Sequence, residues 1–334
     1  MERKIRFAIF GCGGIAHTHI VALRAIDAAE VVGVADIRPD AAIAFAERYS
    51  IKKVFKDYDE ILNSTEVDAI CICTPSGTHS SLGVLALEKN KNVILEKPMS
   101  ITVAECDAII EARKKSLGRV LVISQLRAHP DVRRAKKIID SGALGKITIC
   151  DVNMKYYRGP DYYRGSWRGT KAMDGGGALM NQGIHGVDLL LHLCGDVKNV
   201  RSIKRTLVHD IEVEDTAIAL LEFENGAVGM IEATTGAYPG FNRRFEISGS
   251  DGSIIINEGA IERLVIRGEG IDEYNSISTS EKASNPLVSD ASDHRNQIAE
   301  FVEVLLGNDT IKWCDEHEGK RAVELIERIY NQSI

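Results

Sequence analysis

Short apolar runs alternate with helical stretches through the first 125 residues, and this alternation restricts the fold more than any other feature of the chain. The runs occupy residues 5–10, 31–35, 69–73, 92–95 and 119–124. Continuous apolar strands separated by helices are typical of a parallel sheet that is covered on both faces. We therefore predict an α/β fold in which residues 1–125 form a doubly wound nucleotide-binding domain.

A glycine-rich turn directly follows the first run and opens the first helix. Its residues are Gly11, Gly13, Gly14, Ile15 and Ala16. Glycines in this context let the backbone approach a pyrophosphate, while the helix N-terminus offers N–H donors and the positive end of its dipole. The turn therefore predicts a dinucleotide site of the Rossmann type.

Asp36 ends the second run, about twenty residues after the turn, where a carboxylate accepts hydrogen bonds from the adenosine ribose. A carboxylate at that position repels a 2′-phosphate, so the sequence favours NAD over NADP. Arg38 leaves NADP open, because a guanidinium there can pair with a phosphate or stack on adenine. An acidic surface residue at a strand end is the structural alternative for Asp36.

Two more turns fall at the predicted carboxyl edge of the sheet. Residues 73–79 follow the third run, and Glu96-Lys97-Pro98 follows the fourth. A lysine where a buried strand stops lies at the mouth of the sheet rather than on a solvated face. For residues 73–79, a helix cap is the structural alternative. The cofactor contacts predicted from these turns and from the end of the fifth run are Thr74, Pro75, Ser76, His79, Glu96, Lys97 and Gln125.

After residue 125 the pattern changes to helices and long strands, which predicts an α+β domain over residues 126–334. Expected elements are helices at 131–141, 178–194 and 295–330, and strands at 146–155 and over most of 197–266, with an Asn225-Gly226 hairpin between 216–223 and 227–234. We expect a large, mostly antiparallel sheet with one open face, which a second subunit covers in a homodimer or homotetramer. A mobile loop is expected at residues 276–292, which are rich in Ser and Asp.

The composition argues against several kinds of partner. A net charge of -7 disfavours nucleic acid, which proteins hold with clustered Lys and Arg. No apolar stretch reaches membrane-spanning length, and the apolar start of the chain gives way to the glycine turn too soon for a signal peptide. Several of the seven cysteines lie in apolar runs without zinc-ligand spacing, which predicts reduced thiols, no metal and a cytoplasmic location.

Residues 174–185 carry the second group of candidate side chains. A triple glycine at 175–177 permits close approach of the backbone to a ligand. In the helix that follows, Asn181 and His185 are four residues apart and share a face, and Asp188 is placed to orient the imidazole. A lone histidine on an apolar helix is more often structural, so this pattern by itself leaves both roles open.

Four segments together resemble the Gfo/Idh/MocA family of sugar and cyclitol dehydrogenases, over essentially the whole chain. They are residues 11–16, 73–79, 96–98 and 176–185. The resemblance implies that Lys97 and His185 form the catalytic pair. Asn181 stands where inositol dehydrogenases often have aspartate. Together with residues 125–127 and 166–170, it resembles more closely the branch that oxidises UDP-N-acetylglucosaminuronic acid at the 3-hydroxyl.

Oxidation of a secondary ring hydroxyl needs a base, a cation or donor for the developing alkoxide, and a hydride acceptor at the same carbon. His185 as a neutral imidazole fits the first role, Lys97 fits the second, and Asn181 can bond a neighbouring hydroxyl. We expect an NAD(P)-dependent dehydrogenase acting on CH–OH groups of a sugar, a sugar nucleotide or a cyclitol. The alternatives are a myo-inositol or simple aldose dehydrogenase, and a non-catalytic NAD(P)-binding sensor.

An aromatic and basic loop at residues 156–168 is the expected specificity element. Arginines pair with a carboxylate or a diphosphate, and aromatic rings stack on sugar or uracil faces. Packing beneath the loop is an equal alternative for each aromatic residue. The predicted substrate contacts are Arg127, Tyr157, Trp167, Arg168, Asn181 and His185.

Overall fold

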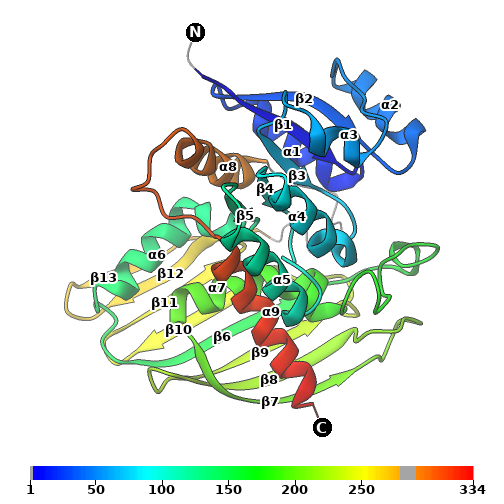
Figure 1. Ribbon diagram of the computed structural model, residues 1–334. Coiled ribbons are helices and arrows are strands. Elements are labelled where there is room, and N and C mark those ends of the chain that lie inside the picture. The colour runs from blue at the N-terminus through cyan, green and yellow to red at the C-terminus, as the bar shows by residue number, and fades with distance from the viewer. Residues whose placement is uncertain (1–2, 279–290, 334) are drawn as a thin grey trace. The chain divides into compact units, whose positions relative to one another are not determined.

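The computed structural model describes residues 3–278 and 291–333 (Figure 1). The chain forms two compact units. The first contains Met1–Gln125 and Ser289–Lys320, and the second contains Leu126–Val288 and Arg321–Ile334. The division at residue 125 inferred from the sequence assigns everything after it to one domain, whereas in the structure residues 289–320 cluster with the first unit.

The first unit is built on a five-stranded sheet in the order β2-β1-β3-β4-β5, with every neighbouring pair parallel. Its strands are β1 (Ile5–Phe10), β2 (Ala29–Ala35), β3 (Ala69–Ile72), β4 (Asn92–Leu95) and β5 (Val120–Val122). Almost every residue of β1, β3, β4 and β5 is buried, as expected for strands covered on both faces. The predicted doubly wound parallel sheet is confirmed.

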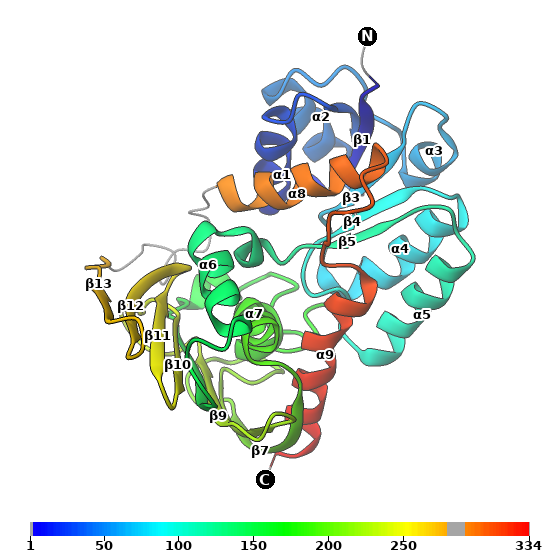
Figure 2. The ribbon, with the colours of Figure 1, turned by 90° about the vertical axis from the view of Figure 1, so that its left-hand side faces the viewer.

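Six α-helices belong to this unit among the residues described: α1 (Gly14–Arg24), α2 (Pro39–Arg48), α3 (Tyr58–Asn63), α4 (His79–Glu88), α5 (Val103–Lys114) and α8 (Ser292–Leu305). Thr102 caps α5, since its Oγ1 accepts the Glu105 N–H at 3.2 Å. Helix α8 packs beside α1 (Figure 2), and its Phe301 is fully buried in the core with Ile20 of α1. The late segment of the chain therefore completes the core of the first unit.

The predicted helix at 295–330 is wrong as a single element. Helix α8 ends at Leu305, and α9 (Glu316–Asn331) begins after a non-helical segment. Gly307 has φ +108°, a conformation that a right-handed helix does not contain. Because the segments on either side of this interruption both have helical periodicity, the pattern alone favours one long helix.

The second unit contains an eight-stranded sheet in the order β13-β12-β11-β10-β6-β9-β8-β7. Its strands are β6 (Ile147–Lys155), β7 (Val197–Arg205), β8 (Thr216–Phe223), β9 (Val228–Thr234), β10 (Arg244–Gly249), β11 (Gly252–Asn257), β12 (Ala260–Ile266) and β13 (Ile271–Tyr274). All neighbouring pairs are antiparallel except β6 with β9. Gly226 adopts φ +85° in the connection between β8 and β9, which confirms the predicted hairpin.

Helices α6 (Pro130–Asp140) and α7 (Ile184–Cys194) lie on one face of this sheet (Figure 2). The other face is apolar in places, because along β8 Ala217, Ala219 and Leu221 are buried while Ile218 and Leu220 are exposed. The expected mostly antiparallel, open-faced sheet is confirmed. The expected mobile loop at 276–292 falls largely outside the described residues. Among the helices described, none is long and apolar enough to cross a bilayer.

Candidate functional site

In the glycine turn after β1, Gly11 is closely surrounded by protein atoms, whereas Gly13 has open space beside it. Gly11 has φ +86°, and a Cβ added to it would lie 2.8 Å from the carbonyl oxygen of Cys73, so no larger residue fits there. A Cβ added to Gly13 would meet no atom within 4 Å. Gly13 is the N-cap of α1 and gives the first turn no side-chain acceptor. The turn thus keeps its helix N-terminus open to an anion, which fits a dinucleotide pyrophosphate.

Asp36, the first residue after β2, is held in a defined orientation. Its Oδ2 accepts the Cys12 N–H at 2.8 Å and its Oδ1 accepts the Arg38 N–H at 2.9 Å. The Asp36 side chain is only 10% exposed, whereas the Arg38 side chain is 69% exposed with its Nε 3.8 Å from Asp36 Oδ1. Ordered acceptor oxygens beside the glycine turn are what binding of ribose hydroxyls requires.

A histidine braces the two remaining turns of this unit. The ring nitrogens of His79 lie 2.7 Å from the Pro98 carbonyl oxygen and 3.0 Å from that of Thr74. His79 is buried, and burial lowers its pKa despite these two acceptors. Thr74 and Pro75 remain half-buried, while Ser76 is buried. His79, predicted as a cofactor contact, is therefore placed as an internal link between the turn at 73–79 and the backbone at Pro98.

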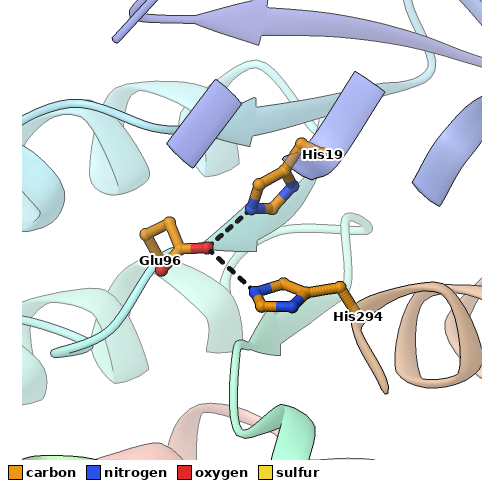
Figure 3. Close-up of side chains that lie close together, drawn as sticks. All are labelled: His19, Glu96 and His294. Carbon is orange, nitrogen blue, oxygen red and sulfur yellow. Dashed lines mark hydrogen bonds and ion pairs between the residues drawn. The ribbon is translucent and has the colours of Figure 1, made fainter. Parts of the chain in front are cut away.

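Glu96 and Lys97 follow β4 and have different environments. Glu96 is buried, with its Oε1 2.6 Å from His19 Nε2 and its Oε2 accepting the Lys97 N–H at 3.1 Å (Figure 3). Lys97 is half-buried. The side chain of Glu96, which was predicted as a cofactor contact, is enclosed by protein. Sequence reasoning missed His19, although it falls on the buried side of α1 with Ile20 and Leu23, where an imidazole needs a polar partner.

The triple glycine of the second unit is explained by the protein's own packing. A Cβ on Gly177 would overlap the Glu214 carbonyl oxygen, and one on Gly176 would overlap the Tyr330 hydroxyl. Glu214 accepts the Gly177 and Leu179 N–H groups at 3.0 and 2.9 Å and the Tyr330 hydroxyl at 2.8 Å. Burial raises the pKa of this carboxyl. The glycines thus allow close approach of Glu214 and Tyr330, where sequence reasoning assigned that space to a ligand.

Asn181 lies in a wide π-helical turn, Ala178–Gly183, that precedes α7. The predicted helix at 178–194 therefore begins with a wider turn than a regular α-helix. Asn181 is buried, and its Nδ2 donates to Asp174 Oδ1 at 2.5 Å. Asp174 Oδ2 in turn accepts the Gly169 N–H at 2.8 Å. Asp174 thus fixes the orientation of the Asn181 amide and ties it to the loop that carries Arg168.

His185 is one of only two residues of α7 that are not buried; the other is His192. Asp188, the predicted partner of the His185 imidazole, is held elsewhere. Its two oxygens accept from Arg127 Nε at 2.9 Å and Arg127 Nη2 at 2.6 Å in a bidentate pair. Both side chains are largely buried, at 12% and 6% exposure. Arg127, predicted to contact a substrate anion, is therefore committed to an internal carboxylate.

Three further arginines occupy the loop at 156–168, of which Arg164 is exposed and pairs with Asp161. Arg158 is buried and donates to Gln182 Oε1 at 3.1 and 2.7 Å. Arg168 is half-buried, with its guanidinium 4.7 Å from the Tyr162 ring and 5.1 Å from the Trp167 ring. Among the described residues no carboxylate pairs with Arg168. Its guanidinium thus contacts two aromatic rings and donates to the Ser166 hydroxyl at 3.3 Å. None of these groups neutralises its charge, which leaves it able to bind an anion.

Other predicted site residues lie beside these groups. The half-buried Tyr157 packs edge-on against Tyr238, with ring centroids 5.1 Å apart. Gln125 is the last residue of the first unit and opens the short helix Gln125–Ala128. All seven cysteines are free and buried. In the first unit the predicted residues lie at the carboxyl edge of the parallel sheet. In the second unit most of them lie between Trp167 and His185, with Arg127 and Tyr157 outside that segment.

Comparison with protein families identifies the chain. Residues 5–124 match the oxidoreductase family model with an NAD-binding Rossmann fold, and residues 132–255 match the GFO/IDH/MocA C-terminal domain. The protein belongs to the Gfo/Idh/MocA family of oxidoreductases. It is an NAD(P)-dependent enzyme acting on CH–OH groups, and the match to the NAD-binding Rossmann model includes the glycine turn that follows β1.

Several known proteins resemble it over most of their length. Two solved structures are WlbA dehydrogenases in complex with NADH and UDP-GlcNAcA. That from Bordetella pertussis is 30% identical with a TM-score of 0.86, covering 99% of this chain and 97% of that one. That from Chromobacterium violaceum is 31% identical with a TM-score of 0.87, covering 100% and 94%. The myo-inositol 2-dehydrogenase of Thermotoga maritima is 29% identical over 273 residues, 79% of each chain.

Replacing Asp36 by serine tests the cofactor geometry. We expect Asp36→Ser to raise the Kd for NADH by about 10- to 100-fold, since one or two hydrogen bonds to a charged acceptor are lost. NADPH binding should weaken much less, because its 2′-phosphate no longer meets a carboxylate. Fluorescence titration with both cofactors measures this change. Asp40→Ser, an exposed acid in the next helix, is the control. Equal weakening of both cofactors would contradict the assignment.

Proposed function

We propose that this enzyme oxidises a secondary ring hydroxyl of an anionic sugar nucleotide of the UDP-GlcNAcA type, using NAD. The observation that carries the proposal is the full-length similarity, at 30% and 31% identity, to two dehydrogenases crystallised with NADH and UDP-GlcNAcA. The residues that the family resemblance assigns to catalysis, Lys97 and His185, are both retained. Neither is fully buried, so both side chains have room to meet a ligand.

In the proposed mechanism, His185 as a neutral imidazole accepts the proton of the substrate hydroxyl. Lys97 stabilises the negative charge that develops on the oxygen as the proton leaves. Asn181, fixed by Asp174, presents its amide to a neighbouring hydroxyl and orients the ring. Bound NAD supplies the acceptor for the hydride. The proposal requires Lys97 and His185 to act on the same substrate oxygen.

Arg168 supports a negatively charged substrate. Of the three arginines near the predicted substrate region, Arg127 is paired with Asp188 and Arg158 is buried against Gln182. Arg168 lies on aromatic rings without a described carboxylate partner. A guanidinium in that state binds a carboxylate or a diphosphate through its fork of donors. An uncharged cyclitol has no carboxylate or phosphate group that could form an ion pair with Arg168.

Oxidation of a cyclitol is the second candidate function. It is supported by the similarity to the myo-inositol 2-dehydrogenase of Thermotoga maritima at 29% identity. Asn181 distinguishes the two candidates, because an amide cannot replace the carboxylate that inositol dehydrogenases often carry at this position in a proton relay. Oxidation of a simple aldose is a third candidate function, and an assay with glucose distinguishes it from the other two. A non-catalytic NAD(P)-binding protein would not need both Lys97 and His185.

Activity with a panel of UDP-GlcNAcA, myo-inositol and glucose, followed as NADH absorbance, tests the proposal. We expect turnover with UDP-GlcNAcA, and we expect Lys97→Met and His185→Ala each to lower kcat by about 10²- to 10⁴-fold while leaving the fold intact. The matched controls are Lys89→Met, an exposed lysine, and His192→Gln on the same helix as His185. Near-normal kcat in either test variant would remove that residue from the mechanism.

Arg168→Met tests the charge of the substrate. The KM for UDP-GlcNAcA should rise by about 10- to 100-fold, because a charge-assisted bidentate contact is lost. Any turnover of myo-inositol should be unchanged. Arg164→Met is the control, since Arg164 lies in the same loop and pairs with Asp161 on the exposed surface. An unchanged KM for UDP-GlcNAcA would place the anion elsewhere.

We also propose that a second copy of the chain covers the open face of the large sheet, in a cytoplasmic homodimer or homotetramer. Exposed apolar residues meet there across paired strands: Ile203 opposite Ile218, and Ile149 opposite Val228. Leu220, 60% exposed, lies between them on the same face. Soluble proteins rarely leave a contiguous apolar surface of this kind uncovered. The seven buried free thiols support a reducing compartment.

Leu220→Lys tests this interface. Burying a lysine against the apolar sheet face of a second copy is unfavourable. We therefore expect the variant to sediment as a monomer at micromolar concentration, whereas the unaltered protein sediments as a dimer or tetramer. Analytical ultracentrifugation measures the change. Leu117→Lys is the control, because Leu117 is 87% exposed in the first unit. A monomeric unaltered protein would overturn the proposal.

A further inference from the structure

Two histidines from opposite ends of the chain share one buried carboxylate in the first unit (Figure 3). His19 comes from α1, Glu96 follows β4, and His294 comes from α8. His19 Nε2 lies 2.6 Å from Glu96 Oε1, a short hydrogen bond, and His294 Nε2 lies 3.8 Å from the same oxygen, at ion-pair distance. All three side chains are at most 6% exposed. None of the roles assigned above uses His19 or His294.

The two imidazoles determine the protonation of Glu96. Burial by itself raises the pKa of a carboxyl group, since it disfavours the charged form. Here burial is outweighed by the interactions of the His19 and His294 imidazoles with the carboxylate, and the pKa of Glu96 lies well below its usual range. Without the two histidines the same enclosure would favour a protonated, neutral Glu96.

Few other ionisable groups face this carboxylate. Cys71 and Cys73 on the side of β3 are neutral thiols, because burial raises the pKa of each. His79 on α4 and Lys97, the next residue along, are also close to Glu96. His79 has its ring nitrogens directed at the Pro98 and Thr74 carbonyl oxygens rather than at Glu96. The His19 and His294 imidazoles are therefore the direct partners of the Glu96 carboxylate among these groups.

The second oxygen of Glu96 connects the cluster to Lys97. Glu96 Oε2 accepts the backbone N–H of Lys97 at 3.1 Å, and the Pro98 carbonyl beyond is held by His79 at 2.7 Å. Buried side chains thus hold the peptide unit directly before Lys97 and the one that follows Pro98. A protonated Glu96 would offer a weaker acceptor to the Lys97 N–H, because charge-assisted hydrogen bonds are the stronger ones.

A metal ion is the other reading of two histidines and a carboxylate, whose ligand atoms lie within 4.8 Å of one another. Two features disfavour it. The 2.6 Å contact between His19 and Glu96 is much shorter than the separation of about 3.4 Å between two tetrahedral ligand atoms that are each about 2.0–2.2 Å from an ion. Metal-binding histidines almost always donate their second ring nitrogen, whereas the Nδ1 atoms of His19 and His294 are buried without a partner among the described residues. Direct pairing of imidazole and carboxylate explains the geometry better.

We propose that His19 and His294 are positioning residues for the reaction: they hold the Glu96 carboxylate, and Glu96 in turn fixes the backbone that carries Lys97. This inference rests on the proposed role of Lys97. It adds a requirement from α8, a helix encoded far from the nucleotide-binding turn, to the chemistry at the carboxyl edge of the sheet.

The test compares His19→Leu with His19→Gln, with UDP-GlcNAcA and NAD as substrates and myo-inositol if the nucleotide is not turned over. Leucine removes the donor, and glutamine can place an N–H near the position of Nε2. His19→Leu should lower kcat by about 10- to 100-fold with an NADH Kd within about threefold of the unaltered value, and His19→Gln should recover most of the loss. His294→Leu should act in the same direction. His17→Leu is the control, since His17 bonds to Tyr49 on another side of α1.

The pH profile separates positioning from simple loss of structure. When His19 is removed, burial is less strongly opposed and the pKa of Glu96 rises, so the acid limb of the kcat profile should move to higher pH in His19→Leu. The move should disappear when Glu96→Gln is added, because no carboxylate remains to be protonated. A general loss of packing would lower kcat at every pH and survive the second substitution. An unmoved acid limb in a folded His19→Leu would overturn the proposal.

Two further measurements keep the outcomes distinct. If Lys97→Met keeps normal kcat, the proposed function of Lys97 fails, and the positioning role fails with it. If Lys97→Met is inactive but His19→Leu and His294→Leu are normal, only the positioning role fails. Elemental analysis of the purified protein should find no stoichiometric zinc. One zinc per chain that is lost in His19→Leu would overturn positioning in favour of a metal site.

Discussion

The parallel register of the first sheet is the constraint on which the rest of the site depends. Phe10 of β1 pairs with Ala35 of β2 and Ile72 of β3, and Ile72 pairs with Leu95 of β4. Four strands therefore end level with one another. The residues that directly follow β1, β2, β3 and β4 are Gly11, Asp36, Cys73 and Glu96, respectively. Local sequence at four separate places is thus converted into a single polar edge against an apolar sheet.

The second unit reaches its polar arrangement by a different route. There the backbone itself is brought close to a buried acid, and glycines at 176 and 177 leave the space that Glu214 and Tyr330 occupy. The amides of this turn are satisfied by Glu214 rather than by a regular helix, and the wide turn at Ala178–Gly183 follows. Asn181 emerges from it already bonded to Asp174. A side chain that is already oriented loses less conformational entropy when it makes a further contact.

Much of the fold follows from periodicity and turn chemistry that act over short distances. The apolar runs at β1, β3 and β4, and the Asn225-Gly226 hairpin, are local signals that the tertiary structure preserves. The interruption after α8 was hidden because Gly307 lies between two segments with the same helical period. For the site, the glycine turn and Asp36 were accessible from the sequence, because the dinucleotide fingerprint is itself a local pattern.

Contacts between distant residues were not accessible in this way. Nothing near Glu96 in the sequence indicates His19 or His294, and nothing near Asp188 indicates Arg127, whose guanidinium takes both of its oxygens. The purpose of the triple glycine was misjudged for the same reason. Glu214, the residue that needs the space, lies 37 positions from Gly177. A single sequence identifies which residues are unusual, and only the fold shows which of them meet.

The late return of the chain to its first half has a consequence for how such proteins can be divided. Val122 donates its N–H to Cys314, the Trp313 indole donates to the Val120 carbonyl, and Gln297 bonds both Val122 and Ser124. Strand β5 is thus sealed by segments synthesised almost two hundred residues later. A nucleotide-binding module cut at residue 125 would lack the segments that form hydrogen bonds with β5 and complete its core. Chimaeras that exchange cofactor preference between relatives must therefore transplant two stretches of sequence together.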